Sequence, residues 1–215
     1  MNDRSLFEKD QNTLAKRTAA ILQISKKYDP KKIQKFAQNF KNWILDNMSD
    51  EMIVDVLNWP NLMLDERKKL VRQLVFFLAE FRQAQKRIKS VHFKNIPDDA
   101  EYTDGIFTIK SKLLLGNNFN DIIGMLSHEM VHMFQRQYQT TLSREIVDVA
   151  NDNYVQPDED EMIYDNNPIE IEAVMVEKII RDGFIEILQR SNNLVATFSN
   201  KNYNSLYGEG DSYER

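Results

Sequence analysis

Residues 127–132 read Ser-His-Glu-Met-Val-His, and this stretch decides how the fold and function of the chain are interpreted. Two histidines four residues apart lie one above the other on one face of an α-helix. Two such imidazoles can bind one zinc ion, with bonds of about 2.0–2.1 Å. In an HExxH pattern, the glutamate after the first histidine is the general base that deprotonates the metal-activated water. The sequence therefore predicts a hydrolytic metal centre formed by His128, Glu129 and His132.

A short pattern of this kind also occurs by chance, so its surroundings matter. The motif lies within an amphipathic segment that we expect to be a helix, from Asn118 or Asn120 to about Tyr138. It contains two of the 3 histidines in the chain. The alternative is a pair of surface histidines that bind no metal.

A catalytic zinc site needs a third protein ligand and one open coordination position. The chain has no cysteine, and no histidine follows the motif, so a downstream ligand must be a carboxylate. We expect Glu170, in the first turn of a helix opened by Asn167-Pro168, and Glu172 is the second choice. Either glutamate could instead bind no metal and only stabilise the helix, because an acidic side chain in the first turn interacts favourably with the positive end of the helix dipole. The remaining candidates are Glu177, His92 and the acidic run 158–161.

The composition favours a mostly helical α+β fold, because Gly (6) and Pro (5) are few. Residues 1–88 carry apolar side chains at helical spacing and form a predicted N-terminal helical region. Short strands are expected at 90–93 and 105–109, with turn signals between them, as part of a small antiparallel sheet. The catalytic domain would then span residues 89–190, and a loose tail would follow at 191–215.

The charge is divided unevenly along the chain. Residues 1–100 hold 19 Lys and Arg against 13 Asp and Glu, whereas residues 101–215 hold 9 against 20. Without an Arg-rich or aromatic-interleaved stretch, the basic half is a poor nucleic-acid signal, and two mutually attracting surfaces are the simpler interpretation. The longest apolar run, about Leu74 to Ala79, is too short for a membrane span. With no secretory leader and no cysteine, we expect a cytoplasmic protein, in a phage or host-cell setting as one option.

At these residues the chain resembles the gluzincin-type HExxH zinc metallopeptidases, especially small intracellular and phage-borne ones. The shared pattern is a strand, the motif on a helix, and a glutamate in an ExxA context on a following helix. The resemblance covers about residues 90–190. It implies a zincin-like catalytic core in which Glu129 is catalytic and zinc is bound by His128, His132 and Glu170.

The resemblance also implies a role for the strand before the motif. Gly105, Ile106, Phe107 and Thr108 would form an edge strand that pairs with an extended peptide substrate through main-chain hydrogen bonds. An ordinary interior strand is the alternative. A Tyr or His often stabilises the oxyanion in such sites, and two tyrosines lie in the right interval, although structural roles are preferred for both: Tyr154 and Tyr164.

Residues 106–115 and the helix after them are also similar to SprT-like proteins. Those proteins place a third histidine after the motif, and many add a cysteine zinc ribbon. This chain has neither feature, so a DNA-linked repair role is not supported.

The leading hypothesis is a zinc-dependent peptidase that acts on peptide or protein substrates. The alternative is a non-catalytic protein that uses the metal fold as a scaffold for binding a protein or nucleic acid. In a third hypothesis, the N-terminal helical region covers the cleft as an inhibitory or specificity domain.

Overall fold

The structure is an α+β fold made mostly of helices, as the sequence predicts. The computed structural model describes residues 3–184 and 186, so the predicted tail 191–215 lies outside the described residues. The elements are α1 (Asp3–Ile24), α2 (Pro30–Asn47), α3 (Asp50–Leu57), α4 (Leu64–Glu80), β1 (Ser90–Lys94), β2 (Ala100–Thr103), β3 (Ile106–Lys110), α5 (Phe119–Gln135), α6 (Arg144–Asp152) and α7 (Glu161–Asp165). Short 3-10 turns occupy Trp59–Asn61, Gln85–Arg87 and Ser111–Leu115, and a further helix spans residues 168–184.

Polar side chains cap the starts of several helices, and the predicted start of α5 at Asn118 is confirmed. The side chains of Asp29, Ser49 and Asn118 accept hydrogen bonds from the first-turn amides of α2, α3 and α5, as N-caps do. At the start of α4, Asp65 lies inside the first turn, and Glu66 accepts a hydrogen bond from the Met63 amide at 2.7 Å.

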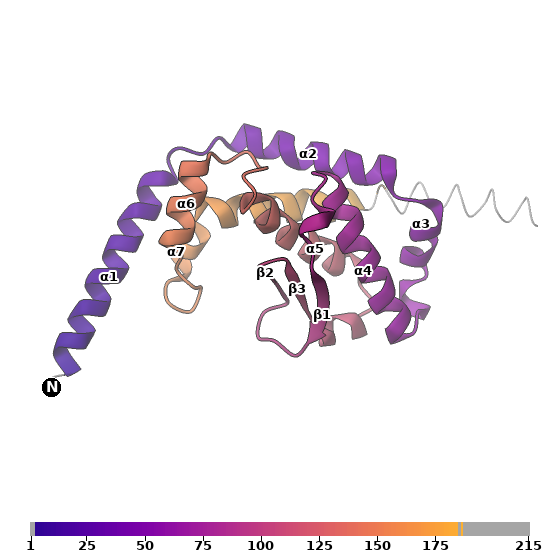
Figure 1. Cartoon of the computed structure of the whole chain (residues 1–215), viewed down its shortest axis with the longest axis horizontal. Coiled ribbons are helices and arrows are strands. Elements are labelled where there is room, and N and C mark those ends of the chain that lie inside the picture. Colours follow the sequence, from indigo (N-terminus) through magenta and orange to yellow (C-terminus); the bar gives the residue numbers. More distant parts are fainter. Residues whose placement is uncertain (1–2, 185, 187–215) are drawn as a thin grey trace, which may run out of the picture.

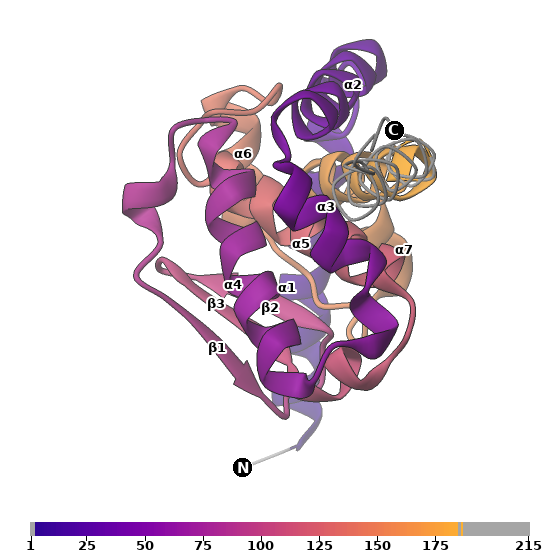
Figure 2. The same cartoon turned by 90° about the vertical axis from the view of Figure 1, so that its right-hand side faces the viewer.

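The sheet has three strands in the order β1-β3-β2 (Figure 2). β1 runs parallel to β3, and β2 runs antiparallel to it, so the sheet is mixed rather than wholly antiparallel as expected. β3 is the central strand, and Phe107, Thr108 and Ile109 are all buried on it. The prediction that residues 105–108 form an edge strand is therefore wrong, because both sides of β3 are already paired. The two edges of the sheet are β1 and β2, and β2 was not predicted from the sequence.

The larger hydrophobic core joins α2, α3, α4, the sheet, α5 and the 168–184 helix. Its centre is aromatic: the Phe40 ring stacks on Phe81 at 4.6 Å and meets Phe134 of α5 edge-on at 5.9 Å. Ala173 is fully buried in this core. We call this cluster the main core, and it carries the predicted metal helix.

Arg67 of α4 fixes the loop that leads into α5. Its side chain is buried, and its guanidinium donates to four backbone carbonyls and lies 5.0 Å from the centre of the Trp59 ring. The indole of Trp59 donates to the Gly116 carbonyl at 2.9 Å. Buried carbonyls need hydrogen-bond donors, and Arg67 and Trp59 supply them to the loop that precedes α5. The carbonyls bound by Arg67 are those of Pro60, Leu62, Leu114 and Gly116.

A second, smaller core forms at the other end of the molecule. It joins Ile21 and Ile24 of α1 to aliphatic side chains of α6, α7 and the start of the 168–184 helix. Figure 1 shows α1 as a long helix that lies against α6 and α7 and extends beyond the rest of the fold. Exposed ion pairs add to this contact, including Arg17 with Glu159 at 3.2 Å. We call this cluster the second core.

The helices of residues 1–88 are thus divided between two cores, because α1 belongs to the second core and α2–α4 belong to the main core. Each core also contains residues from beyond 88, so among the described residues the N-terminal helices have no separate core. Among all the residues that the structure describes, no helix is both long and apolar enough to cross a membrane.

Candidate metal centre

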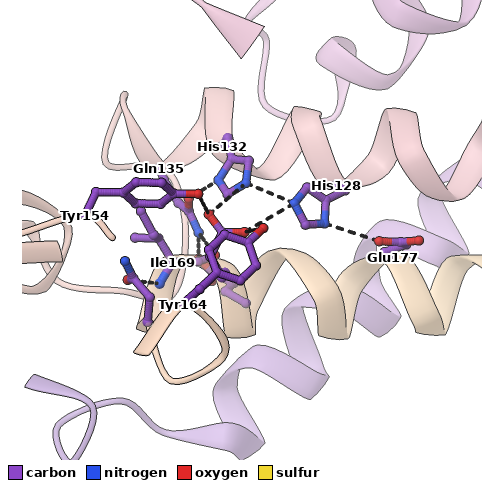
Figure 3. A network of polar contacts seen from close by, with 10 residues as sticks. His128, His132, Gln135, Tyr154, Tyr164, Ile169 and Glu177 are labelled. Atoms are coloured by element: carbon purple, nitrogen blue, oxygen red, sulfur yellow. Dashed lines mark hydrogen bonds and ion pairs between the residues drawn. The ribbon is translucent and has the colours of Figure 1, made fainter. Parts of the chain in front are cut away.

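The helix α5 presents the two motif histidines to one another. Their ring centres lie 4.8 Å apart, and the Nε2 atoms of His128 and His132 are 3.0 Å apart. Figure 3 shows both rings turned toward a common point. The opposite face of α5 is buried in the main core, with Met130, Val131 and Phe134 at 0% exposure. The predicted pairing of the histidines on one helix face is confirmed.

Glu170 joins the two histidines from the first turn of the 168–184 helix. Its side chain is almost fully buried, and its oxygens lie 3.5 Å from Nε2 of His128 and 3.5 Å from Nε2 of His132. Ligand atoms about 2.0–2.1 Å from a tetrahedral metal are about 3.3 Å apart. The two 3.5 Å separations involve different oxygens of Glu170. One ligand atom from each of the three side chains lies within 4.8 Å of the others, so His128, His132 and Glu170 form a group that could hold a metal ion.

Glu172, the second choice as ligand, lies elsewhere. Its carboxylate is fully buried and accepts from the backbone amide of Thr141 at 3.0 Å, from the Thr141 hydroxyl at 2.6 Å and from the Gln135 amide at 3.0 Å. These contacts satisfy both of its oxygens. Glu172 therefore anchors the segment after α5 and is not part of the group around the histidines.

The other ring nitrogen of His132 contacts Gln135. The Gln135 amide nitrogen donates to the Ile169 carbonyl at 2.9 Å and to Glu172, so its oxygen is the acceptor that faces His132 Nδ1 at 2.9 Å. We therefore place a proton on Nδ1 of His132, which leaves the Nε2 lone pair facing the common point.

The ring of His128 is held in the same way. Its Nδ1 lies 3.2 Å from a carboxylate oxygen of Glu177, which in its ionised form only accepts. Arg181 in turn donates to Glu177 at 3.1 Å. With both Nδ1 atoms protonated, two Nε2 lone pairs face each other at 3.0 Å. That arrangement requires a positive charge between them, from a proton or a metal ion. Glu177, weighed earlier as a ligand, thus lies on the far side of His128.

Two tyrosines hold the third ligand candidate. The hydroxyls of Tyr154 and Tyr164 each donate to one oxygen of Glu170, both at 2.9 Å. Burial and the nearby Glu170 carboxylate raise the pKa of both phenols well above their ordinary value, so both remain donors. Each hydroxyl thus supports Glu170, in line with the structural roles preferred for the two tyrosines.

The charges in the site favour a cation. Burial alone lowers the pKa of His128, but hydrogen bonds to Glu170 and Glu177 outweigh it and raise the pKa to about 10. Burial acts to raise the pKa of Glu170, but the two imidazoles outweigh it and hold the pKa below its usual range. Burial also raises the pKa of Glu129, against the effect of His132 and His128. Glu129 is therefore a stronger base than an exposed glutamate.

These groups lie in a cleft of about 580 Å³. One side is β2 (Ala100–Thr103), and the floor includes His128, Glu129 and His132 of α5. The opposite side, which we call the tyrosine wall, consists of Asn151, Tyr154, Gln156, Pro157 and Tyr164. Residues 105–108, predicted to bind substrate, do not line the cleft. The sequence did not predict β2, because this strand is only four residues long and lies between two turn signals.

The other candidate residues lie outside the site. His92 is exposed on β1, where its ring contacts the Ser90 hydroxyl at 2.8 Å. In the acidic run 158–161, Glu159 pairs with Arg17, and Asp160 caps α7. The cleft is lined only by residues between 98 and 177 among those described, so the helical region 1–88 does not cover it.

No known protein family, curated protein sequence or solved structure matches this chain.

Proposed function

We propose that this protein is a zinc-dependent peptidase in which Glu129 acts as the general base. The observation that carries the proposal is the convergence of two imidazoles and a buried carboxylate beside Glu129 in one cleft. A donor set of two nitrogens and one carboxylate oxygen is typical of catalytic zinc sites. With no cysteine in the chain, thiolate sites are excluded.

A zinc ion held by these ligands would activate a water molecule and polarise a peptide carbonyl. The protein's own groups would do the rest. Glu129 would accept a proton from the attacking water and deliver it to the leaving amine nitrogen. Glu177 and Gln135 would keep the two imidazoles oriented through their Nδ1 protons.

Substrate binding would use β2. It is an edge strand of the sheet, it packs against α5, and it lines the same cleft as Glu129. An extended peptide could therefore add to β2 through main-chain hydrogen bonds, with its scissile bond near Glu129. This assignment replaces the residues proposed from the sequence, 105–108.

The direct test is Glu129→Gln, which keeps the side chain's size and removes the base. The zinc-loaded variant should retain one zinc per chain and lose peptidase activity by at least about 10²-fold. Glu161→Gln, at an exposed position in the first turn of α7, is the matched control and should keep wild-type activity.

Wild-type turnover by Glu129→Gln would refute the assigned role. Zinc binding by the wild type without hydrolysis of any peptide would favour the alternative, a metal-bearing scaffold that binds a partner.

A further inference from the structure

The cleft contains more carboxylates than the proposed metal centre requires. Among the described residues, its lining contains six carboxylates and, besides the two histidines, one cationic side chain, Arg136. Three of the carboxylates are already engaged with the histidines or with Arg181. These three are Glu129, Glu170 and Glu177. The remaining three line the cleft at and just before β2, and they are Asp98, Asp99 and Glu101.

Two of these carboxylates are available to a ligand. Asp99 is paired with Lys110 at 3.5 Å. For Asp98 and Glu101, which are exposed, no hydrogen bond or ion pair engages the side-chain carboxylate within the described part of the chain. Arg136 lies over the ring of Tyr102, 5.5 Å from its centre. In the metal-loaded site, the charges of Glu129 and Glu170 offset those of a divalent ion, so the two free carboxylates outweigh Arg136.

The strand geometry places one of these carboxylates where it can contact a bound peptide. Burial alternates along β2, so Ala100 and Tyr102 face the core while Glu101 and Thr103 face outward. In an antiparallel pair, directly opposed side chains have Cβ atoms about 4.5–5.5 Å apart. A substrate side chain opposite Glu101 would thus share its face and lie within reach of a long cationic group. Because β2 packs against α5 and lines the same cleft as Glu129, that position would lie close to the scissile bond.

We propose that the cleft selects extended peptides that carry a lysine or arginine beside the scissile bond, recognised by Glu101 and Asp98. This inference rests on the proposed peptidase function, and it adds the chemical class of the substrate. Partly exposed ion pairs are weak, because water screens the two charges. The expected preference over a neutral side chain is therefore modest, about 3- to 10-fold, and it declines with salt.

The first experiment uses the zinc-loaded full chain and a peptide library, with cleavage sites identified by mass spectrometry. Lys and Arg should be enriched at one position beside the cleaved bond. The double variant Asp98→Asn with Glu101→Gln should lose that enrichment while still cleaving. The matched control, Glu51→Gln with Asp55→Asn, removes two exposed carboxylates of α3 that do not line the cleft, and it should keep the preference.

The second experiment does not require hydrolysis. Two fluorescent decapeptides of alanine and serine, one with two lysines and one with two glutamines, are titrated against the zinc-loaded Glu129→Gln chain. The lysine peptide should bind about 3- to 10-fold tighter at low salt, and Asp98→Asn with Glu101→Gln should remove the difference. Equal binding of the two peptides would overturn the inference, as would cleavage without any preference for Lys or Arg. Selective binding by a wild-type chain that hydrolyses nothing would support the substrate class and count against the peptidase function.

Discussion

The two hydrophobic cores support opposite sides of the same cleft, and they do so by different means. The main core fixes α5 through fully buried aromatic rings such as Phe40 and Phe134. The second core supports the tyrosine wall through aliphatic side chains contributed by α1, α6 and α7, together with exposed ion pairs. The helix that carries the two histidines is therefore held by the main core, the larger of the two. The tyrosine partners of Glu170 depend on a helix from the opposite end of the sequence, so this part of the site should loosen first.

The largest expected effect is on the main core. Phe40→Ala removes a ring that contacts both Phe81 and Phe134, and it should lower the free energy of unfolding by about 3–5 kcal/mol. The measurement is urea denaturation followed by circular dichroism. Phe76→Ala, at a position that is 42% exposed on α4, is the control and should cost under about 1 kcal/mol. Similar losses for the two variants would contradict the assignment of Phe40 to the centre of the core.

A smaller and more local effect is expected in the second core. Ile21→Ala removes a fully buried side chain that α1 contributes against α6, and it should cost about 2 kcal/mol. Hydrogen exchange should show lost amide protection in α6 and α7 while α5 stays protected. Leu22→Ala, at the neighbouring and 40% exposed position, should leave both regions unchanged. Equal loss of protection in α5 would show that the two cores open as one unit.

A pH-dependent effect on stability is expected for the metal-free protein. The pKa of His128 rises from an ordinary 6.5 to about 10 in the folded chain. A raised pKa stabilises the fold fully below about pH 6.5, and this contribution is lost as pH rises toward 10. In the presence of a chelator, the Tm should therefore fall between pH 7 and 10, by about 2–4 °C per kcal/mol lost. His128→Gln should remove this part of the decline, and an unchanged slope would contradict the assigned proton.

Local patterns in the sequence predicted the helix that carries the two histidines and the glutamate that lies beside them. The spacing of His128 and His132 fixes their common face on any helix, and the Asn167-Pro168 signal placed Glu170 in a first turn. Glu172 could not be separated from Glu170 in this way. Its role depends on Thr141 and Gln135, which approach it only through the packing of the chain.

Long-range pairing explains what the sequence did not reveal. The segment 100–103 is too short and too polar to show a strand pattern by itself, and only its pairing with β3 makes it the edge of the sheet. The contact between α1 and α6 likewise joins residues more than a hundred positions apart, such as Ile21 and Ile146 in the second core. Periodicity shows that a helix has an apolar face, but it does not identify the partner of that face.

The most direct test of the account is the zinc content of the purified full chain, measured together with two histidine variants. His128→Ala removes a proposed ligand, whereas His92→Ala removes the exposed histidine of β1, which contacts Ser90. We expect one zinc per chain in the wild type and in His92→Ala, and none retained by His128→Ala after dialysis. A wild-type chain that binds no zinc, or a His128→Ala chain that keeps it, would contradict the metal centre from which the proposed function follows.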